Sequence, residues 1–274
     1  MTASDDARTA SAYAAEPLRS APARVGTPIS PVILYEDVHL LAVDKPARLV
    51  THPAYRHPDG TLCDAVFARQ AARGEGRPWL LHRLDRDTSG VVLFAKTEVA
   101  RRAVVRQFEQ RTIHKRYLAL TAGVPIAPVG MIEAPLRRDP ADRRRSIVDA
   151  NGAYAATRYT VLAHAGDYAL VLAEPLTGRT HQIRAHLAHL GAPLVGDVRY
   201  LAVGHPAASL AEGAMLHAWQ LHLRYPGSGE LWSISAPLPP ALLALAASLA
   251  LPADESALHA RISELTNVKT NVLP

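Results

Sequence analysis

Cysteine is almost absent from this sequence, which has one, Cys63, among 274 residues. A single thiol cannot form an internal disulfide, and it cannot supply the several thiolates of a cysteine-rich metal site. A reducing compartment is the simplest setting for such a chain, so we expect a cytoplasmic protein.

Long apolar runs are missing too. No stretch reaches the roughly 18 apolar residues of a membrane-spanning helix, so we expect no membrane partner. The N-terminus lacks the apolar core of a secretory leader. The chain has instead an excess of basic residues, with a formal net charge of +5 and a sequence pI of about 9.5. A basic balance suits a polyanionic partner but does not by itself demonstrate one.

The length and the 49% of hydrophobic residues allow one large domain or two small ones. Residues 1–27 are rich in Ala, Ser, Thr and Pro, and their acidic and basic residues balance, which predicts a flexible tail. Residues 28–252 have the apolar patterning of a folded domain. Residues 253–274 are weakly patterned and are interpreted as a C-terminal extension.

Short apolar runs, β-branched or alternating, predict strands at 32–35, 40–43, 91–95, 117–122, 159–162, 169–173, 220–225 and 231–235. Helical spacing predicts helices at 62–73, 98–111, 183–190 and 241–251. The first of these has the capping-box residues Thr61 and Asp64 at its start. The Arg- and Asp-rich residues 133–152 predict a hairpin or an extended loop. Because strands outnumber helices and short turns join most of them, the predicted class is α+β with antiparallel or mixed sheets.

One polar stretch interrupts the apolar pattern: residues 82–90 read HRLDRDTSG. A carboxylate, Asp85, lies between the guanidinium groups of Arg83 and Arg86, and a buried strand follows. Loops held by such strands often carry reactive groups. An Asp beside two Arg residues is, however, most often a surface salt bridge when seen alone.

Two further segments combine polar and apolar residues in the same way. Residues 115–120 read KRYLAL, and residues 177–184 read TGRTHQIR. Arg184 could keep a buried carboxylate ionised, because arginine stays protonated and binds carboxylates bidentately. Alone, Tyr117 would be a core aromatic residue, and Arg179 and Arg184 would be surface or phosphate-binding residues.

Taken together and in this order, the three segments resemble the motifs of the RluA-like family of RNA pseudouridine synthases. The resemblance covers residues 32–240. It implies a bent mixed, mainly antiparallel β-sheet with flanking helices and a central RNA-binding cleft. It also implies that uridines in structured rRNA or tRNA are isomerised to pseudouridine, with no cofactor and no metal.

The resemblance assigns roles to individual residues. Asp85 is expected to be the catalytic carboxylate, Arg184 its ion-pair partner and Tyr117 the platform on which the target base stacks. Whether Asp85 acts as a nucleophile or as a base stays open. Residues expected to bind substrate are Arg83, Thr88, Arg179, His181, Gln182, Ile183 and Leu216.

Three alternative functions are less favoured. A metal site at His181, His186 and His189 is disfavoured because no Cys cluster or His-Glu-x-x-His pattern accompanies these histidines. A non-catalytic RNA-binding or ribosome-assembly protein would not need the carboxylate of Asp85. A glycoside hydrolase would need a second catalytic carboxylate, and none stands out in the three motifs.

We further expect a monomer whose basic residues contact RNA phosphates along the approach to the cleft. These residues concentrate in two segments, 101–116 and 137–145.

Overall fold

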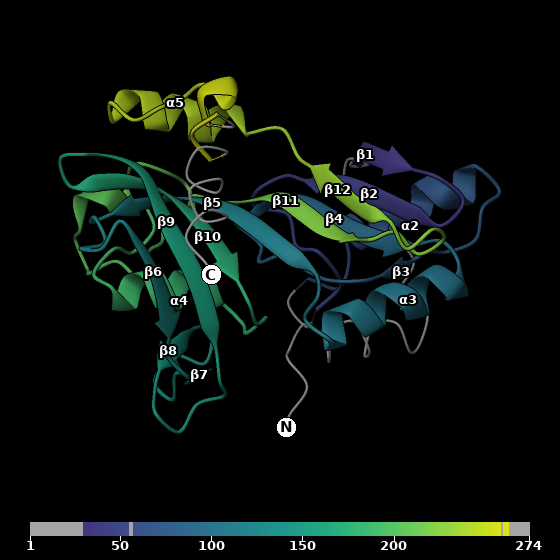
Figure 1. The fold of residues 1–274 in the computed structure, drawn as a ribbon, viewed down its shortest axis with the longest axis horizontal. Helices are drawn as coiled ribbons and strands as arrows, with labels where there is room; N and C mark the ends of the chain where they lie inside the picture. The colour runs from purple at the N-terminus through teal and green to yellow at the C-terminus, as the bar shows by residue number, and fades with distance from the viewer. Residues whose placement is uncertain (1–29, 55–56, 259, 263–274) are drawn as a thin grey trace, which may run out of the picture.

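In the computed structural model, residues 30–54, 57–258 and 260–262 are described, and they are organised around one large β-sheet (Figure 1). The strands are β1 (Val32–Glu36), β2 (Leu40–Lys45), β3 (Trp79–Leu80), β4 (Ser89–Ala95), β5 (His114–Ala122), β6 (Val129–Glu133), β7 (Leu136–Arg138), β8 (Ser146–Val148), β9 (Ala156–Ala165), β10 (Tyr168–Pro175), β11 (Leu216–Arg224) and β12 (Leu231–Ser235). The helices are α2 (Leu62–Ala72), α3 (Glu98–Glu109), α4 (Gln182–His189), the short 3-10 helix η1 (Pro206–Ala208) and α5 (Pro240–Ser248).

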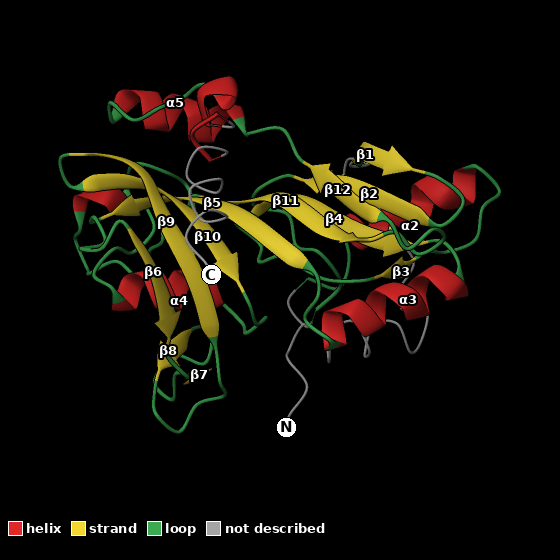
Figure 2. Cartoon of the chain, viewed as in Figure 1, coloured by secondary structure: helices red, strands yellow, loops and turns green. Residues whose placement is uncertain are grey.

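Ten strands form the large sheet in the order β1-β2-β4-β11-β5-β10-β9-β6, with β3 also paired to β4 and β12 to β11. Among the described residues, only the β4–β11 pairing is parallel. The helices flank the sheet (Figure 2). The α+β class with a mixed, mainly antiparallel sheet is therefore confirmed.

Local signals in the sequence account for several element ends. The side chain of Thr61 accepts a hydrogen bond from the Asp64 N–H, and the Asp64 carboxylate accepts one from the Thr61 N–H, which completes the predicted capping box of α2. After α4, Gly191 has a φ of 74°, the left-handed conformation in which many helices end.

The sheet divides where β4 meets β11. Their pairing consists of two residue pairs, Ser89 with His217 and Gly90 with Ala218. Beyond this point β4 pairs with β3, and β11 pairs with β12. Gly90 has a φ of 112°, and a side chain at this position would overlap the backbone of Ala218. The two halves of the sheet thus meet directly beside residues 82–90.

Each face of the sheet has its own helices. On β4, Val92 and Phe94 pack with α2, whereas Leu93 and Ala95 pack with α3, so these helices cover opposite faces. Tyr117 packs with the α2 cluster and also with the cluster around α4. One face therefore has α2, α4 and Tyr117.

In the half of the sheet that contains β5, the face opposite Tyr117 is covered by the C-terminal part of the chain. Leu118 and Leu120 of β5 pack with side chains of α5 and of the helical segment that follows α5. Leu258 and Ile262 are buried there. The domain packing thus continues to residue 262, past the predicted boundary at 252, while the rest of the extension and the predicted tail at 1–27 lie outside the described residues.

The predicted hairpin between residues 133 and 152 is present as β7 and β8, which form a separate two-stranded sheet. It lies below the main sheet in the view of Figure 1, near α4. Leu136 of this hairpin packs with Ala185 of α4. No helix in the described part of the chain is long and apolar enough to cross a membrane.

Candidate active site

The loop between β3 and β4 presents Asp85, and buried polar contacts hold its backbone. The Thr51 hydroxyl donates to the Leu84 carbonyl at 2.8 Å and accepts from the Leu84 N–H at 3.3 Å. The Thr88 N–H donates to the Asp85 carbonyl at 3.2 Å, which closes a turn. The loop is therefore anchored on both sides of the Asp85 side chain.

Lys45 is a third anchor of this loop. Its side chain is fully buried, and its Nζ donates to the carbonyls of Pro46, Leu49 and Arg86 at 2.9, 2.7 and 3.0 Å. Burial lowers the pKa of Lys45 to about 7, against the attraction of the Asp85 and nearby carboxylates. Three carbonyl acceptors match the three N–H donors of an ammonium group, so we assign the protonated form.

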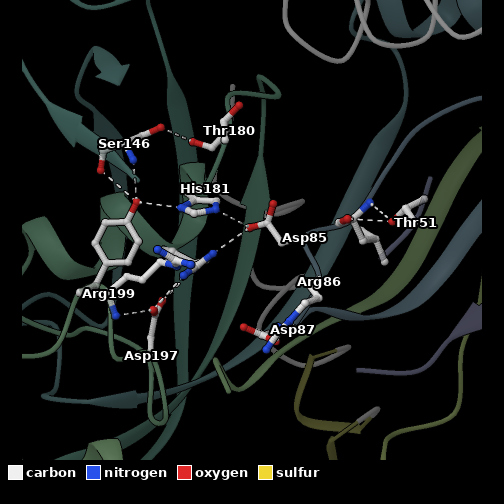
Figure 3. A network of polar contacts seen from close by, with 12 residues as sticks. Thr51, Asp85, Arg86, Asp87, Ser146, Thr180, His181, Asp197 and Arg199 are labelled. Carbon is white, nitrogen blue, oxygen red and sulfur yellow. Dashed lines mark hydrogen bonds and ion pairs between the residues drawn. The ribbon is translucent and has the colours of Figure 1, made fainter. Parts of the chain in front are cut away.

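Asp85 forms an ion pair with Arg184, which lies in the first turn of α4. The Arg184 Nη1 is 3.2 Å from the Asp85 Oδ2. The remaining edge of the guanidinium binds Asp197 bidentately, with Nε–Oδ2 at 2.7 Å and Nη2–Oδ1 at 2.8 Å. Arg184 and Asp197 are 4% and 2% exposed. The two carboxylates, both labelled in Figure 3, thus contact different nitrogens of one guanidinium.

The charges around Asp85 favour its ionised form. Burial raises the pKa of Asp85, but the positive charges of His181, Arg184 and Arg83 outweigh this effect, and the pKa lies below its ordinary value. Burial also lowers the pKa of His181. Of the groups around Asp85, Arg184 and Arg83 carry a positive charge that is permanent near neutral pH, and Arg184 is in direct contact with the carboxylate.

An aromatic side chain covers the other side of this cluster. The Tyr200 ring lies over the Arg184 guanidinium, 5.2 Å from its centre. The Tyr200 hydroxyl accepts from the Ser146 N–H at 3.0 Å and donates to the Ser146 carbonyl at 2.9 Å. The same hydroxyl is 3.3 Å from Nδ1 of His181, whose Nε2 is 3.8 Å from Asp85 (Figure 3). These contacts join α4, β8 and the Asp85 loop into one network.

A pocket of about 540 Å³ opens over Asp85. It is lined by all ten residues that the sequence predicted for the site: Arg83, Asp85, Thr88, Tyr117, Arg179, His181, Gln182, Ile183, Arg184 and Leu216. Tyr117, Ile183 and Leu216 pack in one cluster and form an apolar wall. Lys115, Arg137 and Arg138 add positive charge to the lining. A pocket of this size and composition suits a flat, polar group attached to an anionic chain.

Gln182 lines the pocket, and its amide has four hydrogen-bond partners within the protein. Its amide oxygen accepts from the Thr177 hydroxyl at 2.7 Å and from the Arg179 N–H at 2.9 Å. Its amide nitrogen donates to the Ala156 carbonyl and the Thr157 hydroxyl, both at 2.9 Å. The amide is thus engaged in holding residues 177–181 against β9. Gln182 shapes the pocket, and direct hydrogen bonding to a substrate would break these contacts.

Most of the first basic segment, residues 101–116, does not line the pocket. Of this segment, Lys115 lines the pocket, whereas α3 packs on the opposite face of the sheet from Tyr117. Arg101 of α3 pairs with Glu98 at 2.5 Å. The basic residues of α3 therefore lie on a different surface from the pocket. The charges of a helix do not decide which face of the sheet it covers.

His186, one of the histidines considered as metal ligands, has both ring nitrogens engaged within the protein. His186 is fully buried, and its ring nitrogens are each 2.9 Å from a partner, the Thr157 hydroxyl and the Ala134 carbonyl. Within the described ranges, no group of three or more His, Cys, Asp or Glu residues could hold a metal ion.

Lys45, Asp197 and Tyr200 also belong to the site, although the sequence did not predict them. Each lies outside the three motifs, and each reaches the site through the fold. A lone Asp after the apolar pair Leu194 and Val195 has no distinctive pattern, and neither does a Lys at the end of a strand. Sequence spacing could not have identified these residues.

Comparison with known proteins agrees with this geometry. The family model described as RNA pseudouridylate synthase matches residues 39–189, a range that includes Asp85, Tyr117 and Arg184. A solved structure titled Human RNA Pseudouridylate Synthase Domain Containing 1 is similar to this chain with a TM-score of 0.67 and 30% identity, covering 81% of this chain and 90% of that one.

Two curated relatives support the same assignment. An uncharacterised RNA pseudouridine synthase of Chloroflexus aurantiacus is 46% identical over 200 residues, which are 72% of this chain and 62% of the relative. Ribosomal large subunit pseudouridine synthase D of Nitrosomonas europaea is 41% identical over 220 residues, 78% of this chain and 63% of the relative. The chain thus spans somewhat less than two thirds of either relative. With the family model and these identities in agreement, the chain belongs to the RNA pseudouridylate synthase family.

Proposed function

We propose that this protein isomerises specific uridines in structured RNA to pseudouridine, with Asp85 as the catalytic carboxylate. The observation that carries the proposal is the Asp85 carboxylate in a pocket lined by basic residues, paired with the buried Arg184 at 3.2 Å. A protein that only binds RNA gains nothing from a carboxylate there, because it repels phosphates. Family membership adds independent support.

The reaction needs no change of oxidation state. The bond between N1 of uracil and C1′ of ribose breaks, the base turns, and C5 bonds to C1′; C5 loses a proton and N1 gains one. An ionised carboxylate can attack the sugar or the base as a nucleophile, or remove a proton as a base. The proposal requires no cofactor and no metal.

The pocket wall suits a detached base. Tyr117 offers a flat aromatic surface, and Ile183 and Leu216 offer apolar contacts on which uracil can turn. A uridine inside an RNA stack cannot reach a pocket-bound carboxylate, so the target nucleotide must be flipped out. Arg83 and Thr88 lie on the Asp85 side of the pocket, and Arg179 and His181 lie on the α4 side.

The substrate RNA is proposed from the relatives. The name of the Nitrosomonas europaea relative specifies the large ribosomal subunit, so large-subunit rRNA is the first substrate to test and tRNA the second. The cationic lining contributed by Lys115, Arg137 and Arg138 would contact phosphates, which position an RNA without reading its sequence.

The test uses RNA labelled with tritium at C5 of uracil. The purified protein should release tritium from one of the RNAs, and Asp85→Asn should bind that RNA without releasing tritium. Binding without release by the wild-type protein on every RNA would favour an RNA-binding protein. Release of free uracil would instead indicate cleavage of the glycosidic bond.

A further inference from the structure

Arg184 divides its donors unequally between two carboxylates. The geometry in which arginine binds a carboxylate best is the two-pronged fork. Here the fork formed by Nε and Nη2 is occupied by Asp197, at 2.7 and 2.8 Å, and Asp85 receives one longer bond of 3.2 Å from Nη1. The buried guanidinium is therefore held chiefly by Asp197, while its charge acts on Asp85.

Asp197 is itself firmly held and lies away from the pocket. Its side chain is 2% exposed, it is not among the pocket-lining residues, and its Oδ1 also accepts from the Arg199 N–H at 3.2 Å. Its own N–H donates to the Leu194 carbonyl at 3.2 Å. A carboxylate outside the pocket lining acts on the reaction through the residues that it holds, and its two shortest contacts are those to Arg184.

The unequal sharing of the Arg184 donors leaves one oxygen of Asp85 without a contact to Arg184. Among the described residues, the contacts to the Asp85 carboxylate reach Oδ2, from Arg184 and His181. If Asp197 did not occupy the fork, Arg184 could turn and bind both oxygens of Asp85. Tyr200 opposes the same rotation, because its ring lies over the guanidinium.

We propose that Asp197 is a positioning residue. It occupies the fork of Arg184, so that Arg184 contacts one oxygen of the Asp85 carboxylate and leaves the other oxygen for the reacting nucleotide. The proposal rests on the proposed function of Asp85. Tyr200 assists by stacking on the guanidinium and by joining it to Ser146 and His181.

The experiment measures single-turnover rates and RNA dissociation constants for Asp197→Asn, Arg184→Met and the double variant. In Asp197→Asn an amide NH2 group replaces one carboxylate oxygen and faces an N–H of Arg184. The bidentate interaction with the guanidinium is therefore lost. The rate should fall by at least about tenfold, the lower end of the effect of removing a supporting residue at metal sites. The dissociation constant should change less than twofold.

The double variant separates positioning from a general structural role. If Asp197 acts only through Arg184, adding Asp197→Asn to Arg184→Met should slow the rate no further; fully multiplicative losses would overturn the proposal. The matched control is Glu98→Gln, which removes a carboxylate paired with Arg101 and Arg102 on α3, on the face of the sheet opposite the pocket, and should leave the rate unchanged.

Should Asp197→Asn fail to fold, Asp197→Glu keeps the charge and moves the carboxylate by one methylene. A slower rate at an unchanged melting temperature supports the proposal, and a wild-type rate overturns it. If the wild-type protein modifies no RNA, the proposed function has failed. If the wild type is active and a folded Asp197→Asn variant is equally fast, only the positioning role has failed.

Discussion

The charged residues around Asp85 and those at the tip of the β7–β8 hairpin form two contrasting regions. We call Asp85, Arg184 and Asp197 the floor cluster, and Arg143 and Arg144 the tip pair. In the floor cluster, Arg184 and Asp197 are almost fully buried, and the guanidinium of Arg184 contacts both carboxylates. The tip pair is exposed, and Arg144 pairs with Asp142 in solvent.

The difference in exposure separates two uses of charge. Buried charges interact strongly because little water screens them, but they must be paired, so they fix a geometry. Exposed ion pairs contribute little to stability and exchange their partners readily. The floor cluster is suited to the chemical step, and the tip pair is suited to attracting a polyanion.

Arg145 does not follow its neighbours. Its side chain pairs with the buried Asp139 at 2.7 Å and donates to the Arg199 carbonyl at 2.9 Å. Although it belongs to the same Arg-rich run as the tip pair, it fastens the hairpin to residues 197–200. Substitutions meant to test RNA binding should therefore leave Arg145 in place.

The largest expected effect is that of Asp85→Asn in the floor cluster. Loss of the charge with retention of shape should abolish pseudouridine formation while RNA affinity is largely kept. The control is Asp87→Asn, two residues away, where the carboxylate pairs with the partly exposed Arg86. Single-turnover assays and RNA titrations measure both. Substantial activity in Asp85→Asn would remove this residue from the centre of the reaction.

Arg184→Met should have the next largest effect, because it leaves both carboxylates of the cluster without their cation. Breaking a buried ion pair costs about 3–5 kcal/mol, so the free energy of unfolding should fall together with the rate. Arg184→Lys keeps the charge but has no planar fork, and it should also be slow. Denaturant unfolding and single-turnover rates test this. A fully active Lys variant would show that charge alone suffices.

Replacing the tip pair should weaken RNA binding without stopping the reaction. Arg143→Ala with Arg144→Ala should reduce the salt dependence of affinity by about 0.7 in slope for each phosphate that the variant no longer neutralises. Stability should change by no more than about 0.5 kcal/mol. The modified uridine should stay the same, since backbone contacts position rather than specify.

A salt titration of RNA affinity, together with mapping of the product, measures these effects. Arg145→Ala is the contrasting variant, and it should lower the melting temperature because Asp139 loses its partner. An unchanged salt slope in the double variant would mean that the tip pair does not touch RNA.

The pH dependence of the rate should show no titration of Asp85 between about pH 5 and 8. The pKa of Asp85 is lowered in the folded protein, so its stabilising ionisation is complete above the pKa of an unfolded Asp. This contribution is lost only as the pH falls through the lower, folded-state pKa. Single-turnover rates across the range test this, and an acid limb within it that moves to another pH in a folded Arg184→Lys variant would contradict it.

The smallest effect is expected on α3. Arg102 and Arg106 are exposed on the face of the sheet opposite the pocket. Replacing both with Ala should leave RNA affinity, salt slope and rate close to wild type, despite the removal of as much charge as in the tip pair. A loss of affinity equal to that of the tip-pair variant would show that RNA also follows the α3 surface.

The sequence by itself determined the elements and the three segments that meet at the site. The capping box of Thr61 and Asp64, the short apolar runs in β9 and β10 and the helix end at Gly191 are local signals, and the structure follows each of them. The contact between Asp85 and Arg184 was predicted from a family resemblance, not from their separation along the chain. Local sequence patterns predict these features because each feature depends on hydrogen bonds and burial within a few residues.

Only the tertiary structure decided which other residues complete the site. Asp197 reaches Arg184, and Lys45 reaches the Arg86 carbonyl, because the chain order of the sheet brings distant segments together. The apolar stripe of α3 predicted a packed helix but not which face it covers, since both faces of β4 are apolar. The packing of Leu258 and Ile262 depends likewise on a surface formed by distant strands. Such contacts depend on the three-dimensional arrangement, and a single sequence does not encode them locally.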